Sequence, residues 1–448
     1  MISGLEQFEM IMEKFMMKRI VANLLCLCSL FALSSCSQNG LSSNQTVTDP
    51  SNSIQTNNGN ETQEPEFVSN VASPLTLEEL NSMPIAASSM SEDELRQLCV
   101  DFMNLQLTFP WQPNKTVSFT SGGSKEFINA GTVYGGQSYV SSKYSNIYKV
   151  MHYYDEKTGM LDTEKMGMFF GDIVGNQCSS NSFWAWARVV NSIDWNGTSD
   201  MTLLHGCLRV GPYTYDNNLD RYDHTVHTAA ICSKNGRDTM FASYAAIKKA
   251  DGIVQHNGSA GHVQMATENA IVVTNPDGSI NGDESYVIFQ DQQPSRVTKM
   301  QENGTPISVQ AGLGRKITFS KLFTAGYLPF TFAEFVGTKP VEDGYAKLSH
   351  AGDTITAKEI TDAVITSNYA ISDITVTFKD KEGNIKGSTF YCHGNSGKLC
   401  CKELAISNMG CTAAGLSKHA QDDNLTVEIR VRIGNGEVHT IYTGAFVK

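Results

Sequence analysis

The chain has 448 residues, which is enough for two or three domains with sizeable hydrophobic cores. Charged residues make up only 18% of it and the formal net charge is −12. Binding of nucleic acid or anionic polymers through a basic surface is therefore excluded as its main function. The eleven cysteines would suggest metal or redox chemistry in a cytosolic protein and disulfides in an exported one.

The N-terminus has the pattern of an export signal. The basic pair Lys18-Arg19 precedes an apolar run over residues 20–33 that is too short to span a bilayer comfortably. The next residues, Leu33-Ser34-Ser35-Cys36, resemble the lipobox of bacterial lipoproteins, which implies cleavage before Cys36 and its lipidation. Residues 1–35 are therefore predicted to be a signal peptide. We expect the protein to be extracytoplasmic and lipid-anchored at a bacterial cell membrane or surface.

A polar segment and two helix starts follow the lipidated cysteine. Residues 36–70 are rich in Ser, Asn and Thr, bury too little apolar surface to fold, and are predicted to form a flexible tether reaching about 30–35 Å. Capping boxes begin at Thr76 and at Ser91. Behind the second, apolar residues recur at helical spacing and predict a helix that ends before Phe109-Pro110: Leu95, Leu98, Cys99, Phe102 and Leu105.

A single cysteine lies where a polar turn meets a helix. The turn is Gly175-Asn176-Gln177-Cys178-Ser179-Ser180, and Phe183, Ala187 and Val190 then recur at helical spacing. Cys178 therefore stands at or just before a helix N-terminus, where unpaired N–H groups and the helix dipole favour a thiolate. The alternative is a buried structural cysteine.

Two strands downstream offer partners for this thiolate. Residues 197–260 contain short strand-like runs, among them 229–232 and 252–254. Of the ten histidines, His262 is the one that opens a strand pattern directly behind a glycine turn. Asp291 ends the strand pattern that follows. Because cysteine hydrolysis needs a thiolate, a base and a group that orients the base, Cys178, His262 and Asp291 form a candidate triad.

The remaining histidines and cysteines are weak metal candidates. His224 and His227 lack a cysteine or carboxylate pair at helical register. Four cysteines near the C-terminus predict one or two disulfides in an exported protein, with a zinc site that includes His393 as the alternative: Cys392, Cys400, Cys401 and Cys411. No metal or other cofactor is expected.

The C-terminal third changes to two-residue alternation. Ile374, Val376 and Phe378 alternate with polar residues, and so do the apolar positions of residues 425–433. Hairpins of this kind predict an all-β, antiparallel sandwich of immunoglobulin-like size over residues 306–448. The catalytic candidates lie upstream, within a predicted domain of residues 71–305.

Three short motifs resemble a known family. Gln177-Cys178, Gly261-His262-Val263 and Asp291-Gln292-Gln293 are similar to the Gln-Cys, Gly-His-Val and Glu-x-Asn elements of CHAP amidohydrolase/peptidases. More broadly they resemble the NlpC-type papain-like cell-wall hydrolases, over residues 130–295. The resemblance implies a papain-like α+β fold, and the helices predicted from Thr76 and Ser91 onward would be an N-terminal helical extension of it. It also implies peptidoglycan peptides as substrate.

The same resemblance implies a role for each matching residue. Cys178 would be the nucleophile, His262 the general base and acid, and Asp291 the orienting group. Supporting or oxyanion positions would fall on three further residues, of which Gln293 stands where the family has Asn: Gln177, Gln293 and Tyr139.

These observations predict an exported lipoprotein that hydrolyses amide bonds of cell-wall peptide, or of protein, through an acyl-thioenzyme. It would meet the membrane through a lipid on Cys36 and would not bind nucleic acid. Two alternatives stay open. One is a non-catalytic surface binding or adhesion lipoprotein that uses the sandwich, and the other is a transglutaminase-like acyl transferase with the same Cys–His–Asp order.

Overall fold

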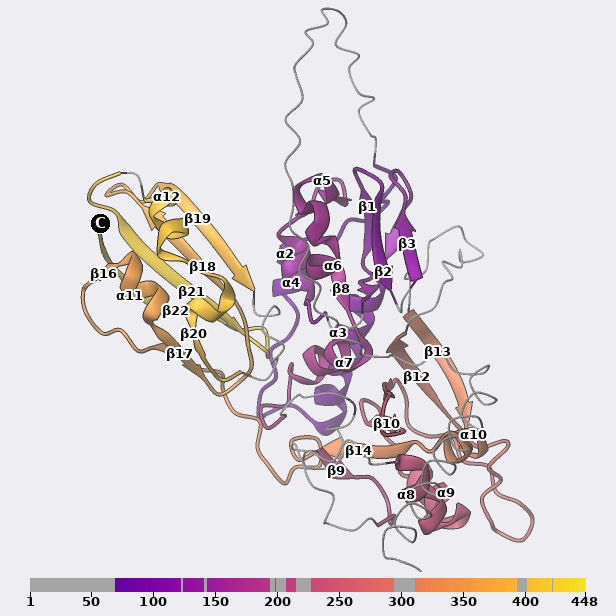
Figure 1. Ribbon diagram of the computed structural model, residues 1–448. Helices are drawn as coiled ribbons and strands as arrows, with labels where there is room; N and C mark the ends of the chain where they lie inside the picture. Colours follow the sequence, from indigo (N-terminus) through magenta and orange to yellow (C-terminus); the bar gives the residue numbers. More distant parts are fainter. Residues whose placement is uncertain are drawn as a thin grey trace, which may run out of the picture. The chain divides into compact units, whose positions relative to one another are not determined.

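The computed structural model describes a mixed α+β protein (Figure 1). The described residues are 69–121, 124–140, 143–193, 198, 207–214, 227–293, 311–392, 401–420 and 422–448. The chain divides into two units, Met1–Cys36 and Ser37–Lys448, and all of these residues belong to the second. The predicted signal peptide, Cys36 and the tether up to residue 68 lie outside them. No helix within the described ranges is long and apolar enough to cross a membrane.

Both predicted capping boxes are confirmed. Thr76 starts α2 (Leu77–Asn81) and Ser91 starts α3 (Glu92–Thr108), each with a glutamate three residues later that bonds back to the cap. The α3 helix buries four residues of the predicted stripe, Cys99 among them, leaves Leu105 partly buried, and ends at Phe109 because Pro110 cannot continue it. Its buried residues belong to the first of two hydrophobic cores, the cluster that also contains Trp186 and Phe330.

Short elements follow α3 and lead to Cys178. They are β1 (Pro110–Pro113), β2 (Val117–Ser121), β3 (Ser124–Ile128), β4 (Tyr134–Gly135), β5 (Ser138–Tyr139), α4 (Ile147–Met151), β6 (Tyr154–Asp155), β7 (Met160–Leu161), α5 (Thr163–Met166), η1 (Gly167–Phe169), α6 (Phe170–Val174) and β8 (Gly175–Asn176). One small sheet has the order β4-β1-β7-β6, and β2 pairs with β3. The parallel pair β5·β8 holds the strand that precedes α7 (Cys178–Trp186).

A six-stranded sheet carries the other half of the first core. Its order is β13-β12-β11-β10-β14-β9, with all neighbours antiparallel. The strands are β9 (Cys207–Arg209), β10 (Gly252–His256), β11 (Gly261–Ala266), β12 (Tyr286–Gln292), β13 (Ala311–Thr318) and β14 (Leu328–Phe332), and the helices of this part are α8 (Thr228–Asn235), α9 (Arg237–Ala245) and α10 (Phe319–Ala325). Helix α7 packs against β11 and β12, and α3 packs against α7.

Two predictions made from the sequence do not agree with this part of the structure. The run at residues 229–232, predicted as strand-like, lies in α8. The predicted domain boundary at residue 305 falls before two strands of the same sheet, because β13 pairs with β12 and β14 pairs with β10. The first core accordingly continues through Phe319 and Phe330, and the second core begins at Ile355.

The second core contains the predicted alternating strands. A five-stranded sheet has the order β16-β22-β21-β18-β19 and a three-stranded sheet the order β15-β17-β20. The elements are β15 (Ala346–Leu348), β16 (Thr354–Thr356), α11 (Ala357–Asp362), β17 (Val364–Ser367), β18 (Ile371–Lys379), β19 (Ile385–Cys392), β20 (Glu403–Ala405), η2 (Ile406–Met409), α12 (Ala413–His419), β21 (Thr426–Ile433) and β22 (Val438–Val447). Ile374 pairs with Val431 across β18 and β21, and both are fully buried.

The expectation of an all-β, wholly antiparallel domain is wrong. Strand β16 pairs parallel with β22. Capped helices also interrupt the strands, with Thr356 starting α11 and Thr412 starting α12. These helices bury Ile360 and Leu416 in the second core. The side-chain caps at Thr356 and Thr412 account for the starts of the two helices.

One of the four C-terminal cysteines does not form an expected bridge. Cys411 is a buried free thiol. Cys392 is also buried, and burial raises its pKa to about 12. Cys400 and His393 lie outside the described residues. No group of His, Cys, Asp and Glu that could hold a metal occurs within the described part of the chain.

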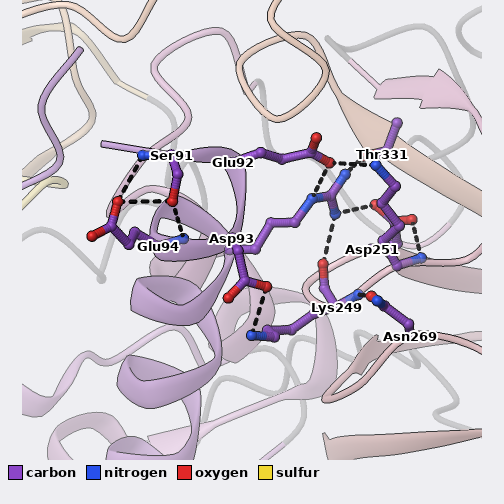
Figure 2. A network of polar contacts seen from close by, with 10 residues as sticks. Ser91, Glu92, Asp93, Glu94, Lys249, Asp251, Asn269 and Thr331 are labelled. Atoms are coloured by element: carbon purple, nitrogen blue, oxygen red, sulfur yellow. Dashed lines mark hydrogen bonds and ion pairs between the residues drawn. The ribbon is translucent and has the colours of Figure 1, made fainter. Parts of the chain in front are cut away.

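A buried ion pair joins α3 to the sheet. Arg96 Nη1 donates to Asp251 Oδ1 at 2.7 Å and to the Lys249 carbonyl at 2.6 Å, and Nη2 donates to Thr331 Oγ1 at 3.3 Å. Figure 2 shows these acceptors gathered near the start of α3, together with Glu92. The Arg96 and Asp251 side chains are only 3% and 2% exposed. The pair therefore fixes α3 against β14 and the turn before β10.

Arg96→Met is expected to lower the free energy of unfolding by about 3–5 kcal/mol, because it leaves the Asp251 carboxylate buried without its cation. Urea denaturation measures the loss. The matched control is Lys248→Met: Lys248 is 54% exposed and bonds Glu92 at the surface, so its loss should be within about 1 kcal/mol. Equal effects of the two variants would contradict a dominant role for the buried pair.

Candidate active site

Cys178 is the first residue of α7, as predicted. Gln177 precedes it in extended conformation, and its N–H donates to Asn176 Oδ1 at 2.9 Å and to Ser180 Oγ at 3.2 Å. The helix runs to Trp186, so the predicted apolar face ends in the turn that follows. Cys178 is 3% exposed. Its position at the helix start favours a thiolate, because the N-terminal end of a helix carries partial positive charge.

His262 and Asp291 meet on neighbouring strands. His262 lies in β11 and Asp291 in β12, and the imidazole Nε2 is hydrogen-bonded to Asp291 Oδ2. The Asp291 side chain is 0% exposed and that of His262 is 17% exposed. A carboxylate on Nε2 keeps the proton there and leaves Nδ1 as the basic nitrogen of the neutral ring. The predicted base and orienting group are therefore in contact.

Arg315, on β13, completes this cluster and was missed in the sequence analysis. Its Nη1 donates to Asp291 Oδ2 at 3.0 Å and to Gln293 Oε1 at 2.8 Å. Gln293 thus bonds the arginine rather than the imidazole. The one signal that could have found Arg315 is the alternation of its strand, which was assigned to a separate domain.

The buried hydroxyl of Tyr327 is influenced by both Cys178 and Asp291. Its hydroxyl accepts a hydrogen bond from Gln264 Nε2 at 3.3 Å. Burial raises the pKa of Tyr327, Asp291 and Cys178 raise it further, and Arg315 lowers it. The Tyr327 hydroxyl is therefore influenced by Asp291, Arg315 and Cys178. The packing of α7 against β11 and β12 agrees with this influence.

A network of buried amides supports the start of α7. Asn181 Nδ2 donates to Gln292 Oε1 at 2.7 Å, and Gln292 Nε2 donates to the Gln137 carbonyl at 2.7 Å. Asn176 Nδ2 donates to Gln137 Oε1 at 3.1 Å, and Gln106 Nε2 donates to Asn181 Oδ1 at 3.1 Å. All five side chains are fully buried. Gln292, to which the sequence analysis gave no role, therefore ties β12 to the cysteine helix.

Tyr139 is another predicted supporting residue, and it is fully buried. Its main chain pairs with Asn176 in the parallel ladder β5·β8. Tyr139 therefore supports the strand that leads into Cys178. His227, by contrast, precedes α8 and forms an isolated bridge to Asn257, and His224 lies outside the described residues.

Gly312 makes room for the carboxylate. It lies opposite Asp291 in the β12–β13 ladder. A Cβ added there would come within 2.1 Å of Asp291 Oδ1 and 2.5 Å of Arg315 Cδ. Both distances are shorter than a non-bonded contact allows, so a larger residue must displace one of these groups.

Gly312→Ala is expected to slow alkylation of Cys178 by iodoacetamide at neutral pH by about tenfold or more, because the displaced Asp291 no longer aligns the imidazole. Mass spectrometry of the labelled peptide measures the rate. The matched control is Gly171→Ala, whose new Cβ would meet Val140 at an ordinary 3.8 Å. An unchanged rate in Gly312→Ala would show that the alignment of Asp291 does not matter.

Comparisons with protein families, with curated proteins and with solved structures found no match. The class of site is therefore defined by its own geometry: a cysteine at a helix start, and a hydrogen-bonded histidine–aspartate pair on the strands that the helix covers.

Proposed function

We propose that this protein is a cysteine hydrolase with a papain-like catalytic domain. The observation that carries the proposal is the His262–Asp291 pair, held on strands that pack against the helix beginning at Cys178. The buried amides around the helix start add support, since a nucleophile works best on a rigid element.

The reaction follows from the roles of the three side chains. His262 Nδ1 takes the thiol proton, and the Cys178 thiolate attacks the carbonyl carbon of the scissile amide. Backbone N–H groups at the start of α7 stabilise the oxyanion. The imidazolium, stabilised by Asp291, gives its proton to the leaving amine and a thioester remains. Water, deprotonated by His262, then attacks the thioester, and the acid and the thiol are released.

The proposed substrate is peptide of the bacterial cell wall. The short motifs around Cys178, His262 and Asp291 support this choice through their resemblance to CHAP and NlpC-type hydrolases. The predicted export signal also supports it, since an exported enzyme would be on the same side of the membrane as the wall. The same proposal includes the second core, which would be an immunoglobulin-like module that binds the wall.

Purified protein incubated with purified peptidoglycan tests the activity. Mass spectrometry should find new amine and carboxyl termini, and Cys178→Ala should yield none. A cross-linked product in place of a free amine would identify an acyl transferase. Cleavage of added protein but not of peptidoglycan would identify proteins as the substrate class. If no product forms and Cys178 is unreactive, the result would favour the alternative function, a non-catalytic surface-binding lipoprotein.

The proposed membrane anchor is a lipid on Cys36. Cys36→Ala should block processing and move the protein from the membrane fraction to the soluble fraction, because the thiol that carries the lipid is absent. Fractionation of expressing cells and the mass of the mature protein measure this. A variant processed and retained like the parent would refute the anchor.

A further inference from the structure

The Arg315 guanidinium is only partly used by the protein. Both of its hydrogen bonds, to Asp291 and to Gln293, come from Nη1. Among the described residues no acceptor bonds its Nε or Nη2, and the side chain is 38% exposed. The guanidinium therefore offers an edge of donors to solvent.

This arrangement is unlike a purely structural ion pair. A buried aspartate that needs only neutralisation favours a two-pronged pair with arginine, in which both carboxylate oxygens accept. Here only Asp291 Oδ2 accepts, and Oδ1 is buried without a partner in the described part of the chain. Gly312 packs against that oxygen. Nη1 is thus shared between two acceptors, while the rest of the fork bonds no acceptor within the described ranges.

We propose that Arg315 binds a carboxylate of the substrate beside the scissile amide. The planar fork of arginine matches a carboxylate in shape and charge. The substrates would then be peptides that carry an acidic side chain or a free C-terminal carboxylate next to the bond that is cut. This inference rests on the proposed function and adds a specificity-determining residue to it.

Contact with the histidine–aspartate pair favours this role. Arg315 bonds Asp291, which bonds the His262 imidazole. A carboxylate on the exposed edge of Arg315 would therefore lie beside the pair that activates the nucleophile in the proposed reaction.

Two alkylating reagents test this without a known substrate. Iodoacetate and iodoacetamide react with a thiolate in the same way, but only iodoacetate carries a carboxylate. We take the rate of iodoacetate divided by the rate of iodoacetamide at Cys178. This ratio cancels changes in the reactivity of the thiolate. Arg315→Gln should lower this ratio by roughly fivefold or more, and Arg315→Lys should retain part of it.

The neighbouring cation provides a matched control. Lys316 is the next residue of β13 and lies over the Tyr286 ring, at 3.6 Å from the centroid. Because successive strand residues face opposite sides of a sheet, Lys316→Gln removes the same charge away from the site. Its ratio should equal that of the parent. An unchanged ratio in Arg315→Gln, or an equal fall in Lys316→Gln, would overturn the inference. Failure of iodoacetamide to label Cys178 in the parent would instead overturn the proposed function, and the inference with it.

Protection experiments separate the two sources of carboxylate. One peptide carries a glutamate and an amidated C-terminus, and the other is neutral with a free C-terminus. Each is tested for slowing the iodoacetamide reaction in the parent and in Arg315→Gln. The peptide that protects the parent more than the variant identifies the source, whereas equal protection of both proteins by both peptides would contradict carboxylate binding at Arg315.

Discussion

Cys178→Ala is expected to abolish hydrolysis, with a loss of about 10⁴-fold or more in kcat, and to leave the protein folded. The nucleophile is removed while the surrounding helix stays the same. In the parent, iodoacetamide should label Cys178 selectively below pH 8, because the helix start and the His262 imidazole favour the thiolate. His262→Ala should abolish hydrolysis and slow this labelling.

The other described thiols provide the comparison. Burial raises the pKa of Cys99, and it raises the pKa of Cys232 to about 11, so both stay protonated and should react slowly. Cys411→Ala, which removes a buried thiol from the second core, is the matched control and should retain full activity. A native Cys178 that resists labelling, or that mass spectrometry finds bonded to another cysteine, would end the enzyme hypothesis.

Asp291→Ala is expected to lower kcat by about 10²–10⁴-fold. The variant removes the acceptor of His262 Nε2, so the imidazole loses both its orientation and the tautomer with a basic Nδ1. Asp291→Asn should be milder, because an amide oxygen can still accept from the ring N–H and from Arg315. Steady-state kinetics measure both variants, and circular dichroism confirms that they are folded.

Gln293→Ala distinguishes the orienting group from its neighbour. Among the described residues Gln293 bonds Arg315 and the imidazole bonds Asp291, so removal of Gln293 should reduce kcat by far less than Asp291→Ala does. A severe effect of Gln293→Ala beside a neutral Asp291→Ala would reverse the two roles.

Local signals in the chain were sufficient to predict the first two helices and the elements that bear the candidate triad. Capping boxes at Thr76 and Ser91 predicted the starts of α2 and α3, and both are present. The turn before Cys178 predicted the start of α7, and turn residues with alternation predicted β11 and β12. Each signal works over a few residues, since a cap, a turn or a periodic face depends on neighbours along the chain.

The long-range pairings required the folded chain. Strand β13 joins β12 across residues 294–310, and β14 lies between β10 and β9. Main-chain hydrogen bonds form these ladders, and they leave no side-chain pattern that names the partner strand. The predicted boundary at residue 305 and the omission of Arg315 have this same cause.

The same reason explains the buried contacts of the site. Gln292 and Gln293 are adjacent and chemically identical, yet one bonds the cysteine helix and the other bonds Arg315. Gln292 is the last residue of β12 and Gln293 follows the strand. Their partners therefore depend on how α7 and β13 pack around this end of β12, which no short motif encodes.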